Sequence, residues 1–200
     1  MLKEQLEKAE VVLLGPGLGD DAFGEDLVKQ IFAGLKQNQI LIVDGGALTI
    51  LARTSLSFLS NQLILTPHQK EWEKLSGITI EKQNEATTAS ALTSFYQGTI
   101  LVEKGPATRI WQVGQSDYYQ LQVGGPYQAT GGMGDTLAGM LAGFAGQFRQ
   151  ASLYERVTVA THLHSAIAQE LSQEHYVVLP TEISNCLPKV MNKISQKRMG

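Results

Sequence analysis

The sequence predicts an α/β fold in which a mainly parallel sheet carries helices on both faces. Short apolar strands alternate with helical segments along the first half of the chain, as they do in such folds. Gly15-Pro16-Gly17-Leu18-Gly19 follows the first strand, and Asp20 and Asp21 then open a helix. A strand, a glycine turn and a helix in this order place ligands at the carboxyl ends of the strands. We therefore expect the functional site at that edge of the sheet.

The strands are expected where short apolar runs end at glycine, proline or a charged residue. Pro67 ends the third run, and Gly105 and Pro106 follow the fourth, after which the chain returns as a hairpin. The last strand alternates polar and apolar residues, which is typical of an edge strand. The expected strands are Val11–Leu14, Ile40–Asp44, Leu63–Leu65, Thr99–Glu103, Arg109–Trp111 and Asp117–Val123.

The helices are expected where apolar residues recur with a helical period. Leu27, Val28, Ile31 and Leu35 give this spacing after Asp21, and Glu182 lies in the first turn of the last helix. The expected helices cover Leu2–Ala9, the segment from Asp20 to Leu35, a short stretch from Ala47, a stretch that begins at Glu71, Glu81–Tyr96, the residues after Asp135, Ser152–Ser172, and a last helix capped by Thr181.

Length and composition restrict the class of protein. The chain has 200 residues, which suits one domain with a sizeable core over residues 1–200. The net charge is −3 and basic residues gather only in the tail Lys189–Arg198, so a nucleic-acid-binding surface is not expected. The single cysteine, Cys186, excludes an internal disulfide and a cysteine metal cluster.

No membrane contact or export is expected from the sequence. No apolar run approaches the roughly 18 residues that a membrane-spanning helix needs. The first residues, MLKEQLEKAE, are charged and helical, unlike a signal peptide. The cytoplasm is therefore the predicted location.

The glycine-rich stretch Gly124–Gly143 is the strongest candidate for a site. Its first glycines precede Asp135, where the pattern changes to that of a helix. Glycines allow a backbone to approach a ligand closely, and a helix N-terminus attracts anions such as phosphate. A carboxylate would repel phosphate, so Asp135 makes sense as the base that deprotonates an attacking hydroxyl. The alternative is that Asp135 caps the helix beside a simple turn.

Other candidates follow the remaining strands. His68 and Glu71 project from one loop-to-helix turn, and Lys104 could place positive charge on a phosphate. Asp44 is expected to hold the structure or to support the residues that contact a ligand. His162 and His164 lie two residues apart and face different sides of a helix, so we interpret both as packing or surface residues.

The motifs together resemble a known family. Ala129–Asp135 resembles the GxGD loop of the ribokinase-like superfamily and, more narrowly, that of the ATP/ADP-dependent NAD(P)H-hydrate dehydratases. Gly15–Gly19 resembles the GPGLG element, Thr66–His68 the TPH element and Lys104–Thr108 the KGxxT element of these enzymes, in the family's order. The resemblance spans roughly Val11 to Leu171 and implies a three-layer α/β/α sandwich.

The resemblance implies an enzyme that repairs hydrated NADH or NADPH. ADP or ATP, with Mg²⁺, phosphorylates the ring hydroxyl in such enzymes, and loss of phosphate restores the dinucleotide. Glu71 matches a residue that orients Mg²⁺ indirectly, and a homo-oligomer is expected. The implied catalytic base is Asp135, the implied substrate-binding residues are Gly17, Gly19, His68 and Asp135, and the implied nucleotide-binding residues are Lys104, Gly105, Pro106, Ala107, Thr108, Gly131, Gly132, Met133 and Gly134.

The sequence departs from the family pattern in places. Met133 replaces the usual threonine, Gln69-Lys70 replaces Pro-Gly, and Gly46 replaces the second acid of a VDADAL element. The family's N-terminal glycine-rich segment has no counterpart before Met1, which suggests a truncated form. Two other functions therefore stay open: a small-molecule kinase of the same superfamily, and a truncated, non-catalytic nucleotide-binding domain.

Overall fold

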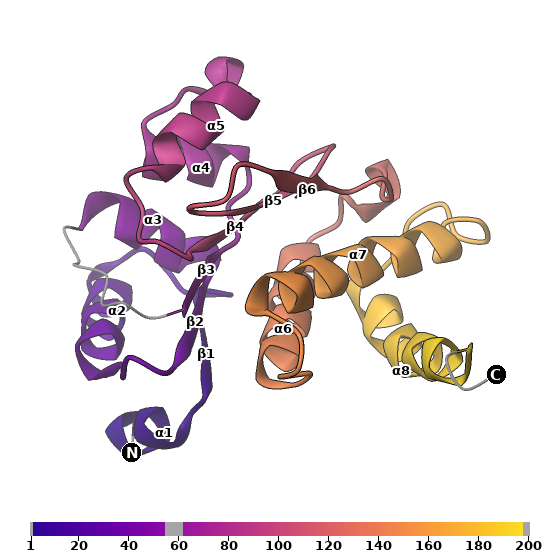
Figure 1. The fold of residues 1–200 in the computed structure, drawn as a ribbon, viewed down its shortest axis with the longest axis horizontal. Helices are drawn as coiled ribbons and strands as arrows, with labels where there is room; N and C mark the ends of the chain where they lie inside the picture. Colours follow the sequence, from indigo (N-terminus) through magenta and orange to yellow (C-terminus); the bar gives the residue numbers. More distant parts are fainter. Residues whose placement is uncertain (1, 55–61, 198–200) are drawn as a thin grey trace.

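A six-stranded sheet organises the chain (Figure 1). The structure is a computed structural model that describes residues 2–54 and 62–197. Within these residues the strands lie in chain order. The first four are parallel, and the last two are antiparallel, so the prediction of a mainly parallel sheet is confirmed. The strands are β1 (Val11–Leu14), β2 (Ile40–Val43), β3 (Gln62–Leu65), β4 (Ile100–Glu103), β5 (Arg109–Gln112) and β6 (Tyr118–Gln120).

The helices form a layer on each face of the sheet (Figure 1). Crossovers between parallel strands are right-handed, so strands paired in chain order place their connecting helices on one face. That face is covered by α1 (Leu2–Lys8), α2 (Ala22–Gly34), α3 (Gly45–Arg53), α4 (Gln69–Ser76) and α5 (Glu85–Leu92), with a 3₁₀ turn η1 (Ile80–Lys82) before α5. The other face is covered by α6 (Met133–Gly146), α7 (Leu153–Leu171) and α8 (Pro180–Lys197), and η2 (Pro126–Gln128) precedes α6.

Two hydrophobic cores lie on opposite faces of the sheet. Side chains alternate across a strand, and a parallel sheet covered on both faces has apolar residues at every position. The β-branched residues Ile40, Ile42, Ile64, Ile100, Val102 and Ile110 point toward α6–α8. Their neighbours Leu41, Val43, Leu63, Leu65, Leu101 and Trp111 point toward α2–α5. The three-layer sandwich therefore follows from the apolar runs that predicted the strands.

One predicted helix is wrong. We expected a continuous helix over Glu81–Tyr96, but the chain forms η1 and then the short helix α5. Asn84 starts α5, because its side chain accepts a hydrogen bond from the Thr87 amide at 3.2 Å while the Thr87 hydroxyl accepts one from the Asn84 amide at 3.0 Å. This reciprocal cap places an N-terminus inside the apolar pattern.

Several predicted boundaries also shift. The helix expected from Glu71 begins at Gln69, and the helix expected from Ala47 begins at Gly45. Thr181 is not a cap, because the last helix already starts at Pro180. Proline is favoured in a first helical turn because its missing N–H would be unpaired there. The predicted strand Asp117–Val123 is shorter and covers Tyr118–Gln120.

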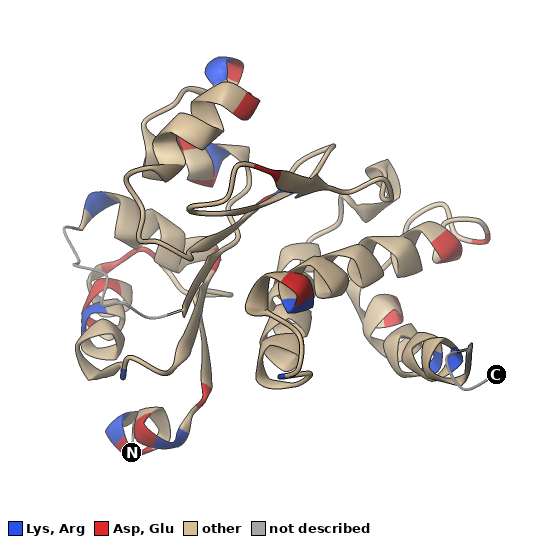
Figure 2. Ribbon diagram, viewed as in Figure 1, with Lys and Arg blue, Asp and Glu red and all other residues tan. Residues whose placement is uncertain are grey.

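Charged residues are dispersed over the fold. Lys and Arg occur beside Asp and Glu on α1, on α2 and near α5 (Figure 2). None of the helices in the described part of the chain is long and apolar enough to span a bilayer.

Candidate active site at the carboxyl edge of the sheet

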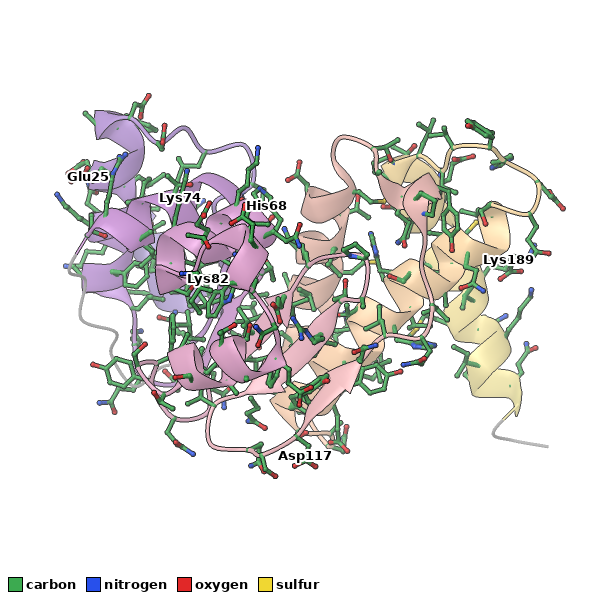
Figure 3. All side chains as sticks on the ribbon, turned by 90° about the horizontal axis from the view of Figure 1, so that it is seen from above. Glu25, His68, Lys74, Lys82, Asp117 and Lys189 are labelled. Carbon is green, nitrogen blue, oxygen red and sulfur yellow. The ribbon has the colours of Figure 1, made fainter. Side chains whose placement is uncertain are left out.

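The loops that follow β3 and β4 lie side by side. His68 pairs with Lys104 in an isolated parallel bridge, and the Lys104 amide donates a hydrogen bond to the Pro67 carbonyl at 2.9 Å. Figure 3, viewed from above, shows His68 near the border between the α2–α5 layer and the α6–α8 layer. His68 and Lys104 therefore lie at the carboxyl edge of the strands, as the sequence predicts.

A buried ion pair joins the ends of β2 and β4. The Lys104 ammonium lies 2.7 Å from Oδ1 of Asp44, which is only 2% exposed. The same oxygen accepts a hydrogen bond from the Thr66 hydroxyl at 2.7 Å. A buried charge is costly unless it is paired and hydrogen-bonded, and both conditions are met here. This agrees with the expectation that Asp44 holds the structure or supports residues of the site.

This ion pair lies against the first turn of α6. Gly132 caps the helix in the left-handed conformation, with φ of 84°, and α6 begins at Met133. A Cβ atom at Gly134 would lie 3.4 Å from Lys104 Nζ and 3.9 Å from Asp44 Oδ2. The Lys104 ammonium, paired with Asp44, therefore lies beside the positive end of the α6 dipole, and a helix N-terminus of this kind suits an anion such as phosphate.

Asp135 is the third residue of α6 and is exposed. The capping position belongs to Gly132. Within the described residues, the Asp135 carboxylate has no hydrogen bond. The structure therefore contradicts the alternative interpretation, in which Asp135 caps the helix. Its carboxylate is accessible to a ligand that approaches the anion site.

His68 and Glu71 are both engaged in starting α4. His68 Nδ1 accepts hydrogen bonds from the amides of Lys70 at 3.1 Å and Glu71 at 3.2 Å. Glu71 Oε2 accepts one from the His68 amide at 2.9 Å, and its Oε1 lies 3.4 Å from His68 Nε2. The His68 side chain is still 53% exposed. Histidine is an uncommon cap, so sequence patterns did not reveal this role.

The loops after β1 and β2 are packed backbone against backbone. A Cβ atom at Gly15, where φ is 119°, would lie 1.7 Å from the Asp44 carbonyl oxygen. One at Gly46 would lie 1.8 Å from the Leu18 carbonyl oxygen. An acid at position 46 would therefore not fit this backbone. Gly17 and Gly19, the sequence candidates, belong to the same loop but have no such backbone neighbour within 3 Å.

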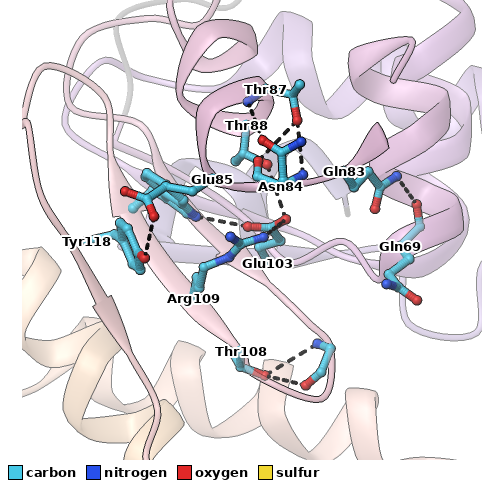
Figure 4. Close-up of polar contacts among 12 residues, drawn as sticks. Gln69, Gln83, Asn84, Glu85, Thr87, Thr88, Glu103, Thr108, Arg109 and Tyr118 are labelled. Carbon is cyan, nitrogen blue, oxygen red and sulfur yellow. Dashed lines mark hydrogen bonds and ion pairs between the residues drawn. The ribbon is translucent and has the colours of Figure 1, made fainter. Parts of the chain in front are cut away.

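Polar contacts stabilise the hairpin between β4 and β5 (Figure 4). Glu103 is 7% exposed and accepts hydrogen bonds from Arg109 at 2.9 Å, Trp111 Nε1 at 3.0 Å and the Thr88 hydroxyl at 3.2 Å. Thr108 closes the loop at the tip of the hairpin, where its hydroxyl donates a hydrogen bond to the Gly105 carbonyl at 3.2 Å. The loop that carries Lys104 is therefore held at both ends.

A cavity of about 490 Å³ opens between this hairpin and the segment Gly124–Gly134, called the glycine loop below. Its volume lies within the range of small-molecule sites, about 300–1,000 Å³. Among the nucleotide-binding candidates, Lys104, Gly105, Pro106, Thr108, Met133 and Gly134 line the cavity, and Ala107, Gly131 and Gly132 do not. The substrate candidates Gly17, Gly19, His68 and Asp135 lie outside it, as does Glu71.

The cavity also contains a residue that sequence reasoning missed. His164, on α7, lines it with only 4% exposure, and its Nε2 has no hydrogen-bond partner in the described part of the chain. Burial lowers the pKa of His164 to about 4, so the ring is neutral at pH 7. His162 lies elsewhere, with Nδ1 3.3 Å from the Tyr119 hydroxyl. The two histidines thus face different sides, as predicted, and His164 faces the cavity.

We expect Asp44→Asn to reduce stability by about 2 kcal/mol, because it leaves the partly buried Lys104 ammonium without a counter-charge. Urea unfolding would measure the change. Lys104→Met is the partner variant, and the double variant completes a thermodynamic cycle. A coupling energy of about 1–3 kcal/mol is expected for groups in direct contact. Additive effects of the two substitutions would show that the pair contributes nothing beyond its separate residues.

Comparison with known sequences identifies close relatives. The family described as NAD(P)H-hydrate dehydratase matches residues 1–189. An ADP-dependent (S)-NAD(P)H-hydrate dehydratase from Streptococcus pneumoniae is 89% identical over 197 residues, which are 98% of this chain and 68% of that protein. The chain thus spans about two thirds of the length of this relative.

Solved structures with the same fold support this relationship. A ribokinase-like superfamily protein from Enterococcus faecalis superposes with a TM-score of 0.90 at 40% identity, over 96% of this chain and 66% of that chain. An ADP/ATP-dependent NAD(P)H-hydrate dehydratase from Bacillus subtilis, crystallised with ATP and Mg²⁺, gives a TM-score of 0.77 at 26% identity, over 96% of this chain and 69% of that one. The ribokinase-like fold expected from the sequence is confirmed.

Proposed function

Because this chain belongs to the NAD(P)H-hydrate dehydratase family, we propose that its carboxyl-edge site carries out the nucleotide-dependent dehydration of hydrated NADH or NADPH. One observation carries the proposal. The Lys104 ammonium, held by Asp44 at 2.7 Å, lies at the start of α6 beside the exposed Asp135 and at the wall of a nucleotide-sized cavity. Both cores pack on one sheet, which supports a single domain over residues 1–200.

The cavity between the hairpin and the glycine loop is the proposed site of ADP or ATP. The loop Lys104–Thr108 and the residues Gly131–Gly134 would bind the nucleotide, with its phosphates at the Lys104 end. The hydrated nicotinamide would lie on the outer side of Asp135, toward Gly17, Gly19 and His68. In this proposal the carboxylate would lie between the two substrates, where a base is required.

Asp135 would accept the proton of the ring hydroxyl, whose oxygen then attacks the terminal phosphorus of the nucleotide. The bond from that phosphorus to its bridging oxygen breaks, and a nucleotide shorter by one phosphate leaves. Lys104 and the amides of Gly132–Gly134 would stabilise the charge on the transferred group. The ring double bond then re-forms with loss of a ring proton, and inorganic phosphate departs.

Mg²⁺ would accompany the nucleotide rather than occupy a site made by the protein alone. The described residues include no group of three His, Cys, Asp or Glu side chains arranged to hold a metal ion. Both carboxylate oxygens of Glu71 already contact His68. Because Mg²⁺ is commonly bound through substrate phosphates and water, Glu71 could at most orient a water of the bound ion. The ion would supply charge neutralisation at the phosphates.

The test is to incubate the protein with hydrated NADH and either ADP or ATP, each with Mg²⁺. We expect the near-ultraviolet absorbance of NADH to return, with one inorganic phosphate released per NADH formed. A phosphorylated hydrate that accumulates without this absorbance would indicate a kinase instead. Binding of nucleotide without any turnover would indicate a non-catalytic nucleotide-binding domain, and the absence of both would overturn every nucleotide-dependent function.

A further inference from the structure

The nucleotide cavity contains a buried polar group that the reaction described above does not use. His164 is 4% exposed, lines the cavity, and has no hydrogen-bond partner for Nε2 in the described part of the chain. Buried polar groups in proteins are nearly always hydrogen-bonded, so an exception inside a ligand cavity points to the ligand. We propose that His164 Nε2 donates a hydrogen bond to the adenosine part of the bound nucleotide, an inference that rests on the function proposed above.

The neighbours of His164 determine which ring nitrogen carries the proton. The Gln128 side-chain oxygen accepts a hydrogen bond from the Gly125 amide at 3.3 Å, which fixes the orientation of the amide group. Its Nε2 is then directed toward His164 Nδ1 at 3.5 Å and the Ser165 hydroxyl at 3.4 Å. A side-chain N–H facing Nδ1 makes that nitrogen the acceptor, so the proton of a neutral ring is on Nε2.

The electrostatics of the cavity assign this donor to an uncharged part of the ligand. Lys104 and the start of α6 provide positive charge at one end, which suits the phosphates. Burial lowers the pKa of His164 to about 4, with a smaller contribution from the charge of Lys104 and against the opposing effect of the Met133 backbone, so the ring stays neutral at pH 7. A neutral N–H among apolar lining residues such as Val123, Pro126 and Leu137 suits a base or a ribose, which carry hydrogen-bond acceptors without charge.

The experiment compares ligands that share the phosphates but differ in the adenosine. We would measure the dissociation constants of ADP and of inorganic pyrophosphate, each with Mg²⁺, by calorimetry for the wild type and for His164→Leu. We expect His164→Leu to weaken ADP binding about tenfold, the effect of leaving a buried acceptor unpaired, and to leave pyrophosphate binding unchanged. His164→Gln restores an N–H donor and should recover part of the affinity. His162→Leu, two residues away on the Tyr119 side of α7, is the matched control and should not change ADP binding.

The possible outcomes separate this inference from the proposed function. A wild type that binds neither ADP nor ATP would overturn the proposed function, and the inference with it. If His164→Leu binds ADP as tightly as the wild type does, the inference alone is overturned. Equal weakening of ADP and pyrophosphate would show that His164 supports the phosphate end or the shape of the cavity, which also overturns it. If His164→Leu melts at a much lower temperature than the wild type, the affinities of His164→Gln for ADP and for pyrophosphate are compared instead.

Discussion

Asp135→Asn is expected to slow the turnover of hydrated NADH by about 10²–10⁴-fold, the usual contribution of a general base. Asparagine keeps the size of the side chain but cannot accept the proton. Helix α6 is capped by Gly132, so no capping hydrogen bond is lost. Only the favourable interaction of a carboxylate with the helix dipole disappears, which costs about 0.3–1 kcal/mol. Turnover and stability should therefore separate clearly in this variant.

Two measurements check this prediction. The first is the rate at which NADH absorbance returns with saturating nucleotide, and the second is the melting temperature. Nucleotide affinity should hold or increase, because a negative charge near the phosphates has been removed. A variant that retains turnover within about threefold of the wild type would fall far short of a base's usual contribution. In that case the exposed carboxylate of Asp135 would have another role.

Gly15→Ala should destabilise the fold by about 2–6 kcal/mol, the sum of backbone strain and overpacking. The φ angle of 119° is unfavourable for alanine, and the new Cβ would lie 1.7 Å from the Asp44 carbonyl oxygen. Natural domains are stable by about 5–15 kcal/mol, so part of the protein could be unfolded at room temperature. Displacement of Asp44 would also move Lys104, because the two are bonded at 2.7 Å.

Gly17→Ala is the matched control in the same loop. Gly17 also has a positive φ, of 69°, but a Cβ atom there would meet nothing within 4 Å. Its substitution should therefore cost only about 1–2 kcal/mol, the penalty of the left-handed conformation. The midpoints of urea unfolding for the two variants provide the comparison. Equal losses would show that conformation alone matters and that the close approach to Asp44 does not.

Local patterns were sufficient to predict the strands and the sheet edge at which His68 and Lys104 lie. The apolar runs at Val11, Ile40, Leu63 and Ile100 are all strands, and Ser152 begins a helix as expected. The glycine loop does lead into a helix that carries Asp135. The continuous helix predicted over Glu81–Tyr96 is wrong for a reason that is also local. The cap formed by Asn84 and Thr87 starts a new helix and outweighs a weak apolar periodicity.

The sequence by itself determined the α/β class, the sheet edge that holds the site, and the residues around Asp135, because periodicity, glycine and helix caps act between close neighbours in the chain. Only the tertiary structure decided which residues far apart in the chain contact each other. Lys104 bonds to Asp44 from 60 residues away, and Gly15 and Gly46 are required because two backbones meet there. The role that we propose for His164 in nucleotide binding likewise depends on the packing of α7 behind the glycine loop. These contacts depend on the pairing of strands and the docking of helices, which no local pattern contains.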